Sequence, residues 1–246
     1  MLPAFSIVIP CFNEEARIGQ TLPLALDYLT ANAPESELIV VNDGSTDATG
    51  AVARERLKSA QIATRLVENF PNRGKGAAVR SGLLAAQTPI GLFSDADLST
   101  PLGEISKVVE PIANGEVDIA LGSRALDRSL IGTHQTWRRE QAGRVFNLLV
   151  RTATGLPFWD TQCGFKAFRL DVCRPILKAA QIEGFAFDVE LLYLAYRAGL
   201  RIREVPVHWN HAEGSKVSFF RDSLRMLREV IGLRQGTTAS KPSSEM

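Results

Sequence analysis

The first half of the chain alternates short apolar runs with longer stretches whose apolar residues recur at helical spacing. The runs have the length of buried strands, and between the first two, apolar residues from Ile18 to Leu29 fall on one face of a helix. Such alternation predicts an α/β fold with a Rossmann-like, mostly parallel central sheet and helices on both faces. The predicted strands span Phe5 to Pro10, Leu38 to Asn42, Thr64 to Glu68, Ile90 to Ser94 and Val117 to Leu121, and a helix is predicted from Gly74 to Gln87.

The alternation becomes less regular beyond Gly122. We predict one domain over residues 1–234, followed by a disordered tail over residues 235–246 that is rich in Thr, Ser and Lys. In the second half, the predicted helices span Trp137 to Thr154, Asp171 to Ala180 and Phe187 to Ala198, and the predicted strands span Gly164 to Phe168 and Arg203 to Trp209.

Charge and cysteine content exclude several kinds of protein. The 246 residues carry 28 Lys and Arg against 27 Asp and Glu, so no overall positive charge draws the chain to nucleic acid. The three cysteines are widely spaced and form no CxxC pair, which favours a reducing compartment over a disulfide or zinc protein. With no signal peptide and no apolar run of about 20 residues, we expect a cytoplasmic protein that is at most peripheral to a membrane.

Acidic residues follow two of the predicted strands. Asp43 ends the second strand, and Asp95 and Asp97 follow the strand Ile90 to Ser94. Parallel strands bring their carboxyl ends to one edge of a sheet, so these carboxylates are expected to lie together. Asp95 and Asp97 project on the same side of an extended chain and predict a Mg²⁺ or Mn²⁺ site beside a nucleotide diphosphate, although a pair of loop-capping aspartates gives the same pattern.

Three turns near those acids each have a structural and a functional interpretation. Asn13 follows the first strand, where it either caps the next helix or faces a ligand. Asp43 precedes a glycine turn in which Ser45 or Thr46 caps the next helix, or it accepts a hydrogen bond from a base or ribose. The segment Asn72 to Gly76 contains two cations and two glycines at the start of a predicted helix. Its backbone amides and its lysine either face a phosphate or belong to a solvated turn. The segment is not a Walker loop, because the GxxxxGK(S/T) spacing is absent.

Arginines and histidines mark the second half of the chain. Arg124 follows the fifth predicted strand, and Arg138 and Arg139 lie further along. Guanidinium groups bind phosphate in a bidentate manner, so three arginines near the sheet edge suit an anionic second substrate, although each alone is more often a surface residue. His208 and His211 would form a metal pair on a helix, but their segment is predicted as strand and loop, which disfavours a metal site.

Taken together, these segments resemble the family 2 glycosyltransferases with the GT-A fold, and within them the polyprenyl-phosphate hexosyltransferases of the dolichyl-phosphate β-glucosyltransferase group. The resemblance runs from about Phe5 to Leu233. The first three motifs below identify the superfamily, and the last three narrow the acceptor to a lipid phosphate. The motifs are Val8 to Glu14, Asn42 to Asp47, Asp95 to Asp97, Asp160 to Lys166, Phe187 to Leu192, and Trp209 with Gly214 to Lys216.

The resemblance implies roles for individual residues. The mannosyl relatives often carry Gln two residues after the second Asp, where this chain has Ser99, which weakens a mannosyl assignment and leaves the metal one ligand short. The implied nucleotide-sugar site consists of Pro10, Asn13, Glu14, Asp43, Lys75, Asp95, Ala96 and Asp97, of which Asp95 and Asp97 hold Mg²⁺ or Mn²⁺. The implied acceptor-phosphate site consists of Arg124, Arg138 or Arg139, Ser215 and Lys216, and the implied catalytic residues are Asp188, Glu190 and Arg124.

The implied reaction is the transfer of a hexose, which we expect to be glucose from UDP-glucose, to a dolichyl or undecaprenyl phosphate with inversion by a single displacement. An acceptor phosphate is anionic near neutral pH, with a second pKa of roughly 6, and needs little help from a base. Three alternatives stay open: mannosyl transfer from GDP-mannose, transfer to a soluble saccharide or alcohol with Asp188 as base, and a nucleotidyltransferase or nucleotide-sugar-binding module. The sequence predicts no oligomeric state.

A lipid acceptor requires contact with a membrane surface. From Val217 onward, apolar residues fall on one helical stripe that is flanked by arginines. This pattern predicts either a helix at the surface of an anionic membrane or a helix that packs its stripe on the protein's own core. The stripe consists of Val217, Phe220, Leu224, Leu227 and Ile231, and the arginines are Arg221, Arg225 and Arg228.

Overall fold

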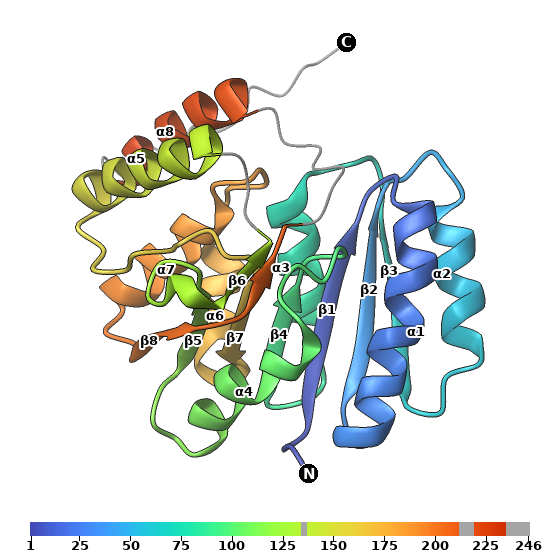
Figure 1. Ribbon diagram of the computed structural model, residues 1–246. Coiled ribbons are helices and arrows are strands. Elements are labelled where there is room, and N and C mark those ends of the chain that lie inside the picture. The colour runs from blue at the N-terminus through green and yellow to red at the C-terminus, as the bar shows by residue number, and fades with distance from the viewer. Residues whose placement is uncertain (134–136, 212–218, 235–246) are drawn as a thin grey trace.

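The computed structural model describes the backbone of residues 1–133, 137–211 and 219–234, and their side chains except at 137–139, 219–224 and 234. Figure 1 shows a central sheet covered by helices on both sides, and a pair of helices, α5 (Trp137–Thr154) and α8 (Phe219–Arg234), that pack on each other. The predicted tail over residues 235–246 lies outside the described residues, and the assignment of residues 1–234 to one domain stays a prediction.

The central sheet has seven strands in the order β3-β2-β1-β4-β7-β5-β8. All neighbouring strands are parallel except β7, which is antiparallel to both β4 and β5, so the predicted mostly parallel sheet is confirmed. Because β7 runs against its neighbours, its amino end lies at the edge where β4 and β5 have their carboxyl ends. The strands are β1 (Phe5–Cys11), β2 (Glu37–Asp43), β3 (Ala63–Asn69), β4 (Ile90–Ser94), β5 (Ile119–Ser123), β7 (Phe165–Arg169) and β8 (Ile202–Pro206), and a separate pair joins β6 (Ile131–Thr133) to β9 (Trp209–Asn210).

Helices cover both faces of this sheet, as the sequence predicts. Successive residues of β1 belong to different cores, with Val8 packed under one layer of helices and Ile7 and Ile9 under the other. The layer over Val8 contains α3 (Lys75–Ala85), α6 (Leu170–Ala179) and α7 (Phe187–Arg197), and the opposite layer contains α1 (Glu15–Asn32), α2 (Thr49–Lys58) and α4 (Ile105–Ala113).

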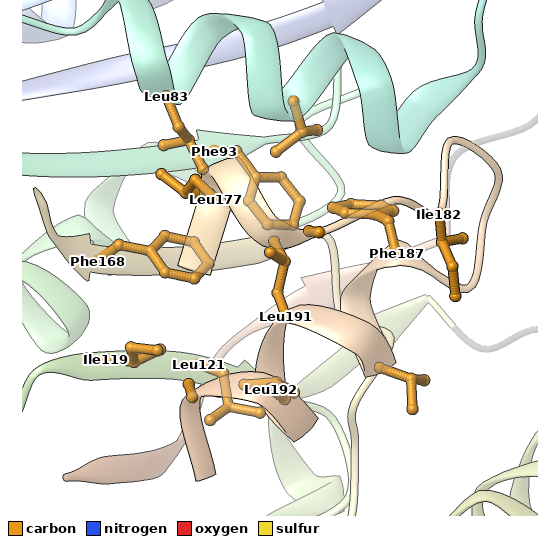
Figure 2. Packing of buried hydrophobic residues seen from close by; sticks show 14 of the residues in the cluster. Leu83, Phe93, Ile119, Leu121, Phe168, Leu177, Ile182, Phe187, Leu191 and Leu192 are labelled. Atoms are coloured by element: carbon orange, nitrogen blue, oxygen red, sulfur yellow. The ribbon is translucent and has the colours of Figure 1, made fainter. Parts of the chain in front are cut away.

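An aromatic cluster fixes the start of α7 against the sheet. Figure 2 shows Phe93 of β4 between Phe168 of β7 and Phe187, the first residue of α7. The ring centroid of Phe93 lies 6.4 Å from that of Phe168 and 5.6 Å from that of Phe187. Each buried aromatic side chain stabilises the fold by roughly 1.5–3 kcal/mol. The packing therefore holds the next residue, Asp188, close to the end of β4.

Several elements differ from the prediction. The strand expected from Val117 to Leu121 begins at Ile119, although Asp118 just before it already binds Arg201 through its backbone N–H and its carboxylate, both at 2.8 Å. The strand expected from Arg203 to Trp209 is divided into β8 and β9, because the chain pairs with β5 as far as Pro206 and then, from Trp209, with β6 in a separate sheet. The sequence patterns give no bounds for α2, the helix expected after the Asp43 turn, and do not predict α4.

Candidate active site

The turn after β4 presents the two predicted metal ligands at the carboxyl edge of the sheet. The N–H of Asp95 donates to the carbonyl of Gly164 at 3.1 Å, and Asp97 Oδ1 accepts a hydrogen bond from the N–H of Ser99 at 2.9 Å. Leu98 has a φ of 48°, a left-handed conformation that closes the turn. Both carboxylates therefore stand at the end of a buried strand, and the turn is tied to the amino end of β7.

Asp95 lies between a glycine and a lysine. A Cβ on Gly164 would lie 2.0 Å from Asp95 Oδ2, so only glycine leaves room for this carboxylate. On the other side, Asp95 Oδ1 is 2.6 Å from Lys75 Nζ, and the two side chains are 33% and 23% exposed. Burial alone lowers the pKa of Lys75, but the negative charges of Asp95 and Asp188 outweigh it and raise that pKa. Lys75 is therefore a cation at neutral pH.

A second ion pair in this region is almost completely buried. Lys166 Nζ of β7 is 2.5 Å from Asp188 Oδ1 and 2.6 Å from the carbonyl oxygen of Cys163, and the Lys166 and Asp188 side chains are 1% and 4% exposed. The ammonium group also lies 5.2 Å from the ring centroid of Phe93. Burial raises the pKa of Asp188, and the positive charges of Lys166 and Lys75 oppose the increase. This arrangement favours a charge-balancing role for Asp188 over direct removal of a substrate proton.

Glu190 holds the loop before α7. Its carboxylate oxygens accept hydrogen bonds from the N–H groups of Gln181 at 2.9 Å and Ile182 at 2.7 Å, and the residue is 2% exposed. Burial raises the pKa of Glu190, and these two backbone hydrogen bonds oppose the increase. These contacts favour a structural role for Glu190, and the catalytic role expected for it stays a prediction.

The amino end of α3 is closed by protein groups. The N–H groups of Gly76 and Ala77 donate to the carbonyl of Glu183 at 2.8 and 3.3 Å, and the N–H of Gly74 donates to Asp43 Oδ2 at 2.7 Å. Of the two interpretations of this segment, the one in which its amides face a phosphate is wrong for Gly74, Gly76 and Ala77, because the N–H of each already has an acceptor in the protein. The side chain of Lys75 remains as the group of this segment that faces the Asp95 turn.

Asp43 binds the loop that precedes α3. Its Oδ2 accepts hydrogen bonds from the N–H groups of Arg73 at 3.1 Å and Gly74 at 2.7 Å. The side-chain amides of Asn72 and Asn69 donate to Oδ2 and Oδ1, both at 2.9 Å. Asp43 is also only 2% exposed. These contacts favour the structural interpretation, in which Asp43 shapes the loop instead of presenting a free carboxylate to a base or ribose.

Asn13 joins the first two βα turns. It has a φ of 51°, its Oδ1 accepts a hydrogen bond from the N–H of Thr46 at 2.8 Å, and its own N–H donates to Ser45 Oγ at 3.0 Å. The prediction that Asn13 caps a helix is wrong, because α1 starts after Glu14 without a side-chain cap. Neither Ser45 nor Thr46 caps α2, whose first N–H donates to Asp47 Oδ1 at 3.0 Å.

A shallow hollow of about 440 Å³ opens beside this connection. Its carboxylates outnumber its single arginine, so it offers acceptors for the N–H and O–H groups of a nucleoside and repels phosphate. The other two residues of the predicted nucleotide site, Pro10 and Ala96, are not among the residues that line this hollow, and their roles stay predictions. The hollow is lined by Asn13, Glu14, Glu15, Ala16, Arg17, Gln20 and Asp47.

Arg124 is bound by a partner that the sequence did not reveal. Its N–H, Nε and Nη2 groups donate to the Asp160 carboxylate at 2.9, 2.7 and 2.8 Å. The guanidinium carbon also lies 5.4 Å from the ring centroid of Trp209. Burial lowers the pKa of Arg124, but Asp160 outweighs it and raises that pKa. Arg124 is thus fixed in place, with its backbone N–H and two of the five N–H donors of its guanidinium group bound to Asp160.

The other residues of the predicted acceptor-phosphate site have side chains that lie outside the described residues. Arg138 and Arg139 lie on α5, but their side chains are outside the described residues, as are Ser215 and Lys216 entirely. The structure therefore leaves these four assignments as predictions.

His208 is held by Glu104. His208 Nδ1 lies 2.9 Å from Glu104 Oε1, and its N–H donates to Glu104 Oε2 at 3.0 Å. Within the described residues, no cluster of three or more His, Cys, Asp or Glu side chains can hold a metal. An ion at Asp95 and Asp97 would take its other ligands from substrate oxygens and water, which suits Mg²⁺ because it is usually held by one or two carboxylates and phosphates.

The predicted stripe on α8 is divided between the core and the surface. Leu227 packs against the core beside Met226 and Val230, which are 7% and 0% exposed, whereas Ile231 is 46% exposed. The core interpretation is therefore correct for Leu227. The side chains of Val217, Phe220 and Leu224 lie outside the described residues.

Helix α5 has an apolar surface that the sequence reading did not single out. Val145 and Leu148 are each 58% exposed and Leu149 is 43% exposed, and their spacing places them on one face. Together α5 and α8 carry eight arginines and three acids, a local excess of positive charge in a chain whose net charge is +1. No helix in the described parts of the chain is both long and apolar enough to cross a bilayer.

The sequence analysis assigned no individual role to three further residues of this site, although they lie in the motif Asp160 to Lys166. These residues are Asp160, Gly164 and Lys166. A usable signal was present, because Lys166 is a lysine inside the apolar strand Phe165–Arg169, and a buried lysine requires a partner.

Known proteins are similar to this chain in sequence and in fold. The glycosyl transferase family 2 model matches residues 6–177. The dolichyl-phosphate beta-glucosyltransferase of Dictyostelium discoideum is 33% identical over 242 residues, which cover 93% of this chain and 73% of the relative. The protein of the same name from Drosophila melanogaster is 38% identical over 238 residues, covering 92% and 73%.

A solved structure supports the fold. Glucosyl-3-phosphoglycerate synthase from Mycobacterium tuberculosis, in complex with Mn²⁺, UDP-glucose and phosphoglyceric acid, has a TM-score of 0.68 and 24% identity, covering 95% of this chain and 79% of its own. The predicted GT-A fold is confirmed by this similarity and by the sheet. Because the family match covers more than half of the residues and the relatives exceed 30% identity, the chain belongs to glycosyl transferase family 2.

Proposed function

We propose that this glycosyltransferase moves glucose from UDP-glucose to a polyprenyl phosphate, with inversion at the anomeric carbon. The observation that carries the proposal is the carboxylate turn Asp95–Asp97 beside Lys75, in a chain whose relatives at 33% and 38% identity are named dolichyl-phosphate beta-glucosyltransferases. The similar solved structure contains Mn²⁺ and UDP-glucose, which supports the same donor and the same class of metal here.

The charges around the turn suit a metal-bound diphosphate. The site has one more carboxylate than cations, so a single divalent ion makes it net positive. Such an ion, when held by Asp95 and Asp97, would neutralise charge on the leaving diphosphate. Lys75 lies where it can bind the same diphosphate. The carboxylates are Asp95, Asp97, Asp160 and Asp188, and the cations are Lys75, Arg124 and Lys166.

The acceptor chemistry requires no general base. An oxygen of the acceptor phosphate forms a bond to the anomeric carbon while the bond from that carbon to the UDP oxygen breaks, and UDP leaves with the electron pair. A phosphate monoester is already anionic at neutral pH, so no proton has to be removed. This supports a lipid phosphate over a soluble alcohol, because Asp188 is buried in an ion pair and Glu190 is bound by backbone amides.

Contact with a membrane is part of the proposal, because the acceptor is a lipid. The exposed face of α5, formed by Val145, Leu148 and Leu149, would enter the apolar boundary of the bilayer. The arginines of α5 and α8 would bind anionic headgroups, each contributing about 1 kcal/mol near a charged surface. We infer that the enzyme acts at the cytoplasmic face, since its widely spaced cysteines favour a reducing compartment.

A reconstituted assay tests the proposed reaction. Purified protein is incubated with radiolabelled UDP-glucose and liposomes that contain dolichyl or undecaprenyl phosphate, with Mg²⁺, with Mn²⁺ or with EDTA. We expect free UDP and a glucosylated lipid whose anomeric configuration, measured by NMR, is inverted, and we expect EDTA to abolish both. GDP-mannose and soluble saccharides serve as competing substrates. Preferential labelling from GDP-mannose, a glycosylated soluble acceptor or a retained configuration would each contradict the proposal.

A further inference from the structure

We propose that Lys75 is a built-in counter-cation that occupies Asp95 before substrates bind and is released by the nucleotide, so that metal and nucleotide bind cooperatively. The inference rests on the proposed function, because it assumes that the Asp95–Asp97 turn receives a metal-bound diphosphate. Its starting point is the 2.6 Å contact between Lys75 Nζ and Asp95 Oδ1. A metal ion that approaches Asp95 therefore meets a positive charge already in place.

The position of Asp95 gives it little freedom to avoid Lys75. Its Oδ2 lies over the α-carbon of Gly164, where a Cβ would be only 2.0 Å away, and its N–H is bound to the carbonyl of the same glycine. One oxygen of the carboxylate thus faces Gly164, just before β7, and the other contacts Lys75. A cation that binds to Oδ1 competes with the lysine side chain for this oxygen.

The backbone of Lys75 is fixed, but its side chain can move. The neighbouring amides of Gly74 and Gly76 are bound by Asp43 Oδ2 and by the Glu183 carbonyl, at 2.7 and 2.8 Å. The side chain is flexible and 23% exposed, and its ammonium group is tied to a single carboxylate, Asp95. The ammonium group can therefore leave Asp95 without any change in the helix.

A separate cation keeps Asp188 neutralised when Lys75 moves. The charge of Asp188 acts on Lys75, but its direct partner is Lys166, at 2.5 Å in an almost fully buried pair. Release of Lys75 from Asp95 thus leaves Asp188 with its counter-ion in place. The two lysines have different tasks: Lys166 is a permanent partner, and Lys75 is an exchangeable one.

Electrostatics then set the order of binding. A divalent ion alone must displace Lys75, and the two positive charges then repel each other with no phosphate between them. A nucleotide diphosphate supplies that anion, so the metal binds the carboxylates while Lys75 moves to phosphate oxygens. Replacing Lys75 by a neutral residue should strengthen binding of the metal alone and weaken binding of the nucleotide alone, two effects of opposite sign from one substitution.

Titration with Mn²⁺, with the free ion measured by electron paramagnetic resonance, tests this inference without turnover. For the wild-type protein, saturating UDP should strengthen Mn²⁺ binding by about tenfold or more, the reciprocal coupling expected between two ligands that share a switch. In Lys75→Met, Mn²⁺ alone should bind about five- to tenfold tighter than in wild type, and the effect of UDP should shrink by a similar factor. Lys75→Arg, which keeps the charge, should resemble wild type.

Lys107→Met is the matched control, because Lys107 Nζ also pairs with a carboxylate, Glu104, at 2.7 Å but away from the Asp95 turn. It should leave Mn²⁺ binding unchanged. The inference is overturned if Lys75→Met binds Mn²⁺ no tighter than wild type, or if UDP does not affect Mn²⁺ binding by the wild-type protein, a result that requires no variant to fold. Failure of the wild-type protein to bind Mn²⁺ even with UDP would instead refute the proposed function.

Discussion

Replacing Lys166 by Met is expected to destabilise the protein by about 3 kcal/mol at neutral pH, because it leaves Asp188 charged and buried without its partner. The magnitude follows from the geometry: the two side chains are 1% and 4% exposed and their charged atoms are 2.5 Å apart. Removing one partner of such a pair costs about 3–5 kcal/mol. The lower end applies because Met retains the apolar stem against Phe93 and because Lys75 still acts on Asp188.

The destabilisation should depend on pH in a defined direction. Burial already raises the pKa of Asp188, and loss of Lys166 removes the strongest charge that opposes this increase. A raised pKa in the folded state means that folding favours the protonated form, so this contribution to stability is present at low pH and is lost as pH rises through the folded pKa. The stability gap between Lys166→Met and wild type should therefore widen from about pH 4 upward and then become constant.

Urea unfolding followed by circular dichroism, at pH values from 4 to 8, measures this gap. The double variant Lys166→Met with Asp188→Asn should recover most of the loss, because it removes the unpaired charge as well. Lys107→Met, which breaks a more exposed pair, should cost less than about 1 kcal/mol. The reasoning is refuted if Lys166→Met is as stable as wild type at pH 7, or if its loss is the same at every pH.

Three further predictions concern the turn, the loop and the surface. Gly164→Ala should lower turnover by about tenfold or more with an unchanged circular dichroism spectrum, because its Cβ would lie 2.0 Å from Asp95 Oδ2 and displace the carboxylate. Removal of a general base lowers turnover by about 10²–10⁴-fold, and we expect Glu190→Gln to lower turnover by much less. If turnover falls by that factor across the pH–rate profile, Glu190 acts as a base. The double variant Leu148→Glu with Leu149→Glu should reduce flotation with anionic liposomes. The control Leu24→Glu, at an exposed apolar position on α1, should float like wild type. If wild type and both variants float equally, the α5 surface does not bind the membrane.

The sheet and its functional edge follow from local sequence signals. Apolar runs of strand length mark β1, β2 and β4 because each of these strands is buried on both faces. Acids placed directly after such runs must lie at the carboxyl edge, and Asp95 and Asp97 do. The positions of the strands and of the acids that follow them are both inferred from residues adjacent in the chain, and both agree with the structure for this reason.

The hydrogen-bond partners of the site residues could not be inferred in the same way, because each partner is distant in the sequence from the residue that it binds. Asp160 binds Arg124 from 36 residues away, and the carbonyl of Glu183 closes α3 from more than 100 residues away. Neither contact has a local pattern. The sequence therefore identified groups with the right chemistry, such as the α3 amides, without showing that other parts of the chain already bind them.

The direction of β7 explains most of what the sequence left open. Had β7 been parallel to β4, Gly164 and Cys163 would lie at the opposite edge of the sheet, far from the Asp95 turn. Insertion of β7 between β4 and β5 in the antiparallel sense places Gly164 under Asp95 and pairs Lys166 with Phe93 across the ladder. Lys166 then reaches Asp188, which packing of Phe187 on Phe93 holds at the same place. One reversed strand thus assembles both the support for Asp95 and the permanent counter-ion of Asp188, and this leaves Lys75 available to exchange between protein and nucleotide.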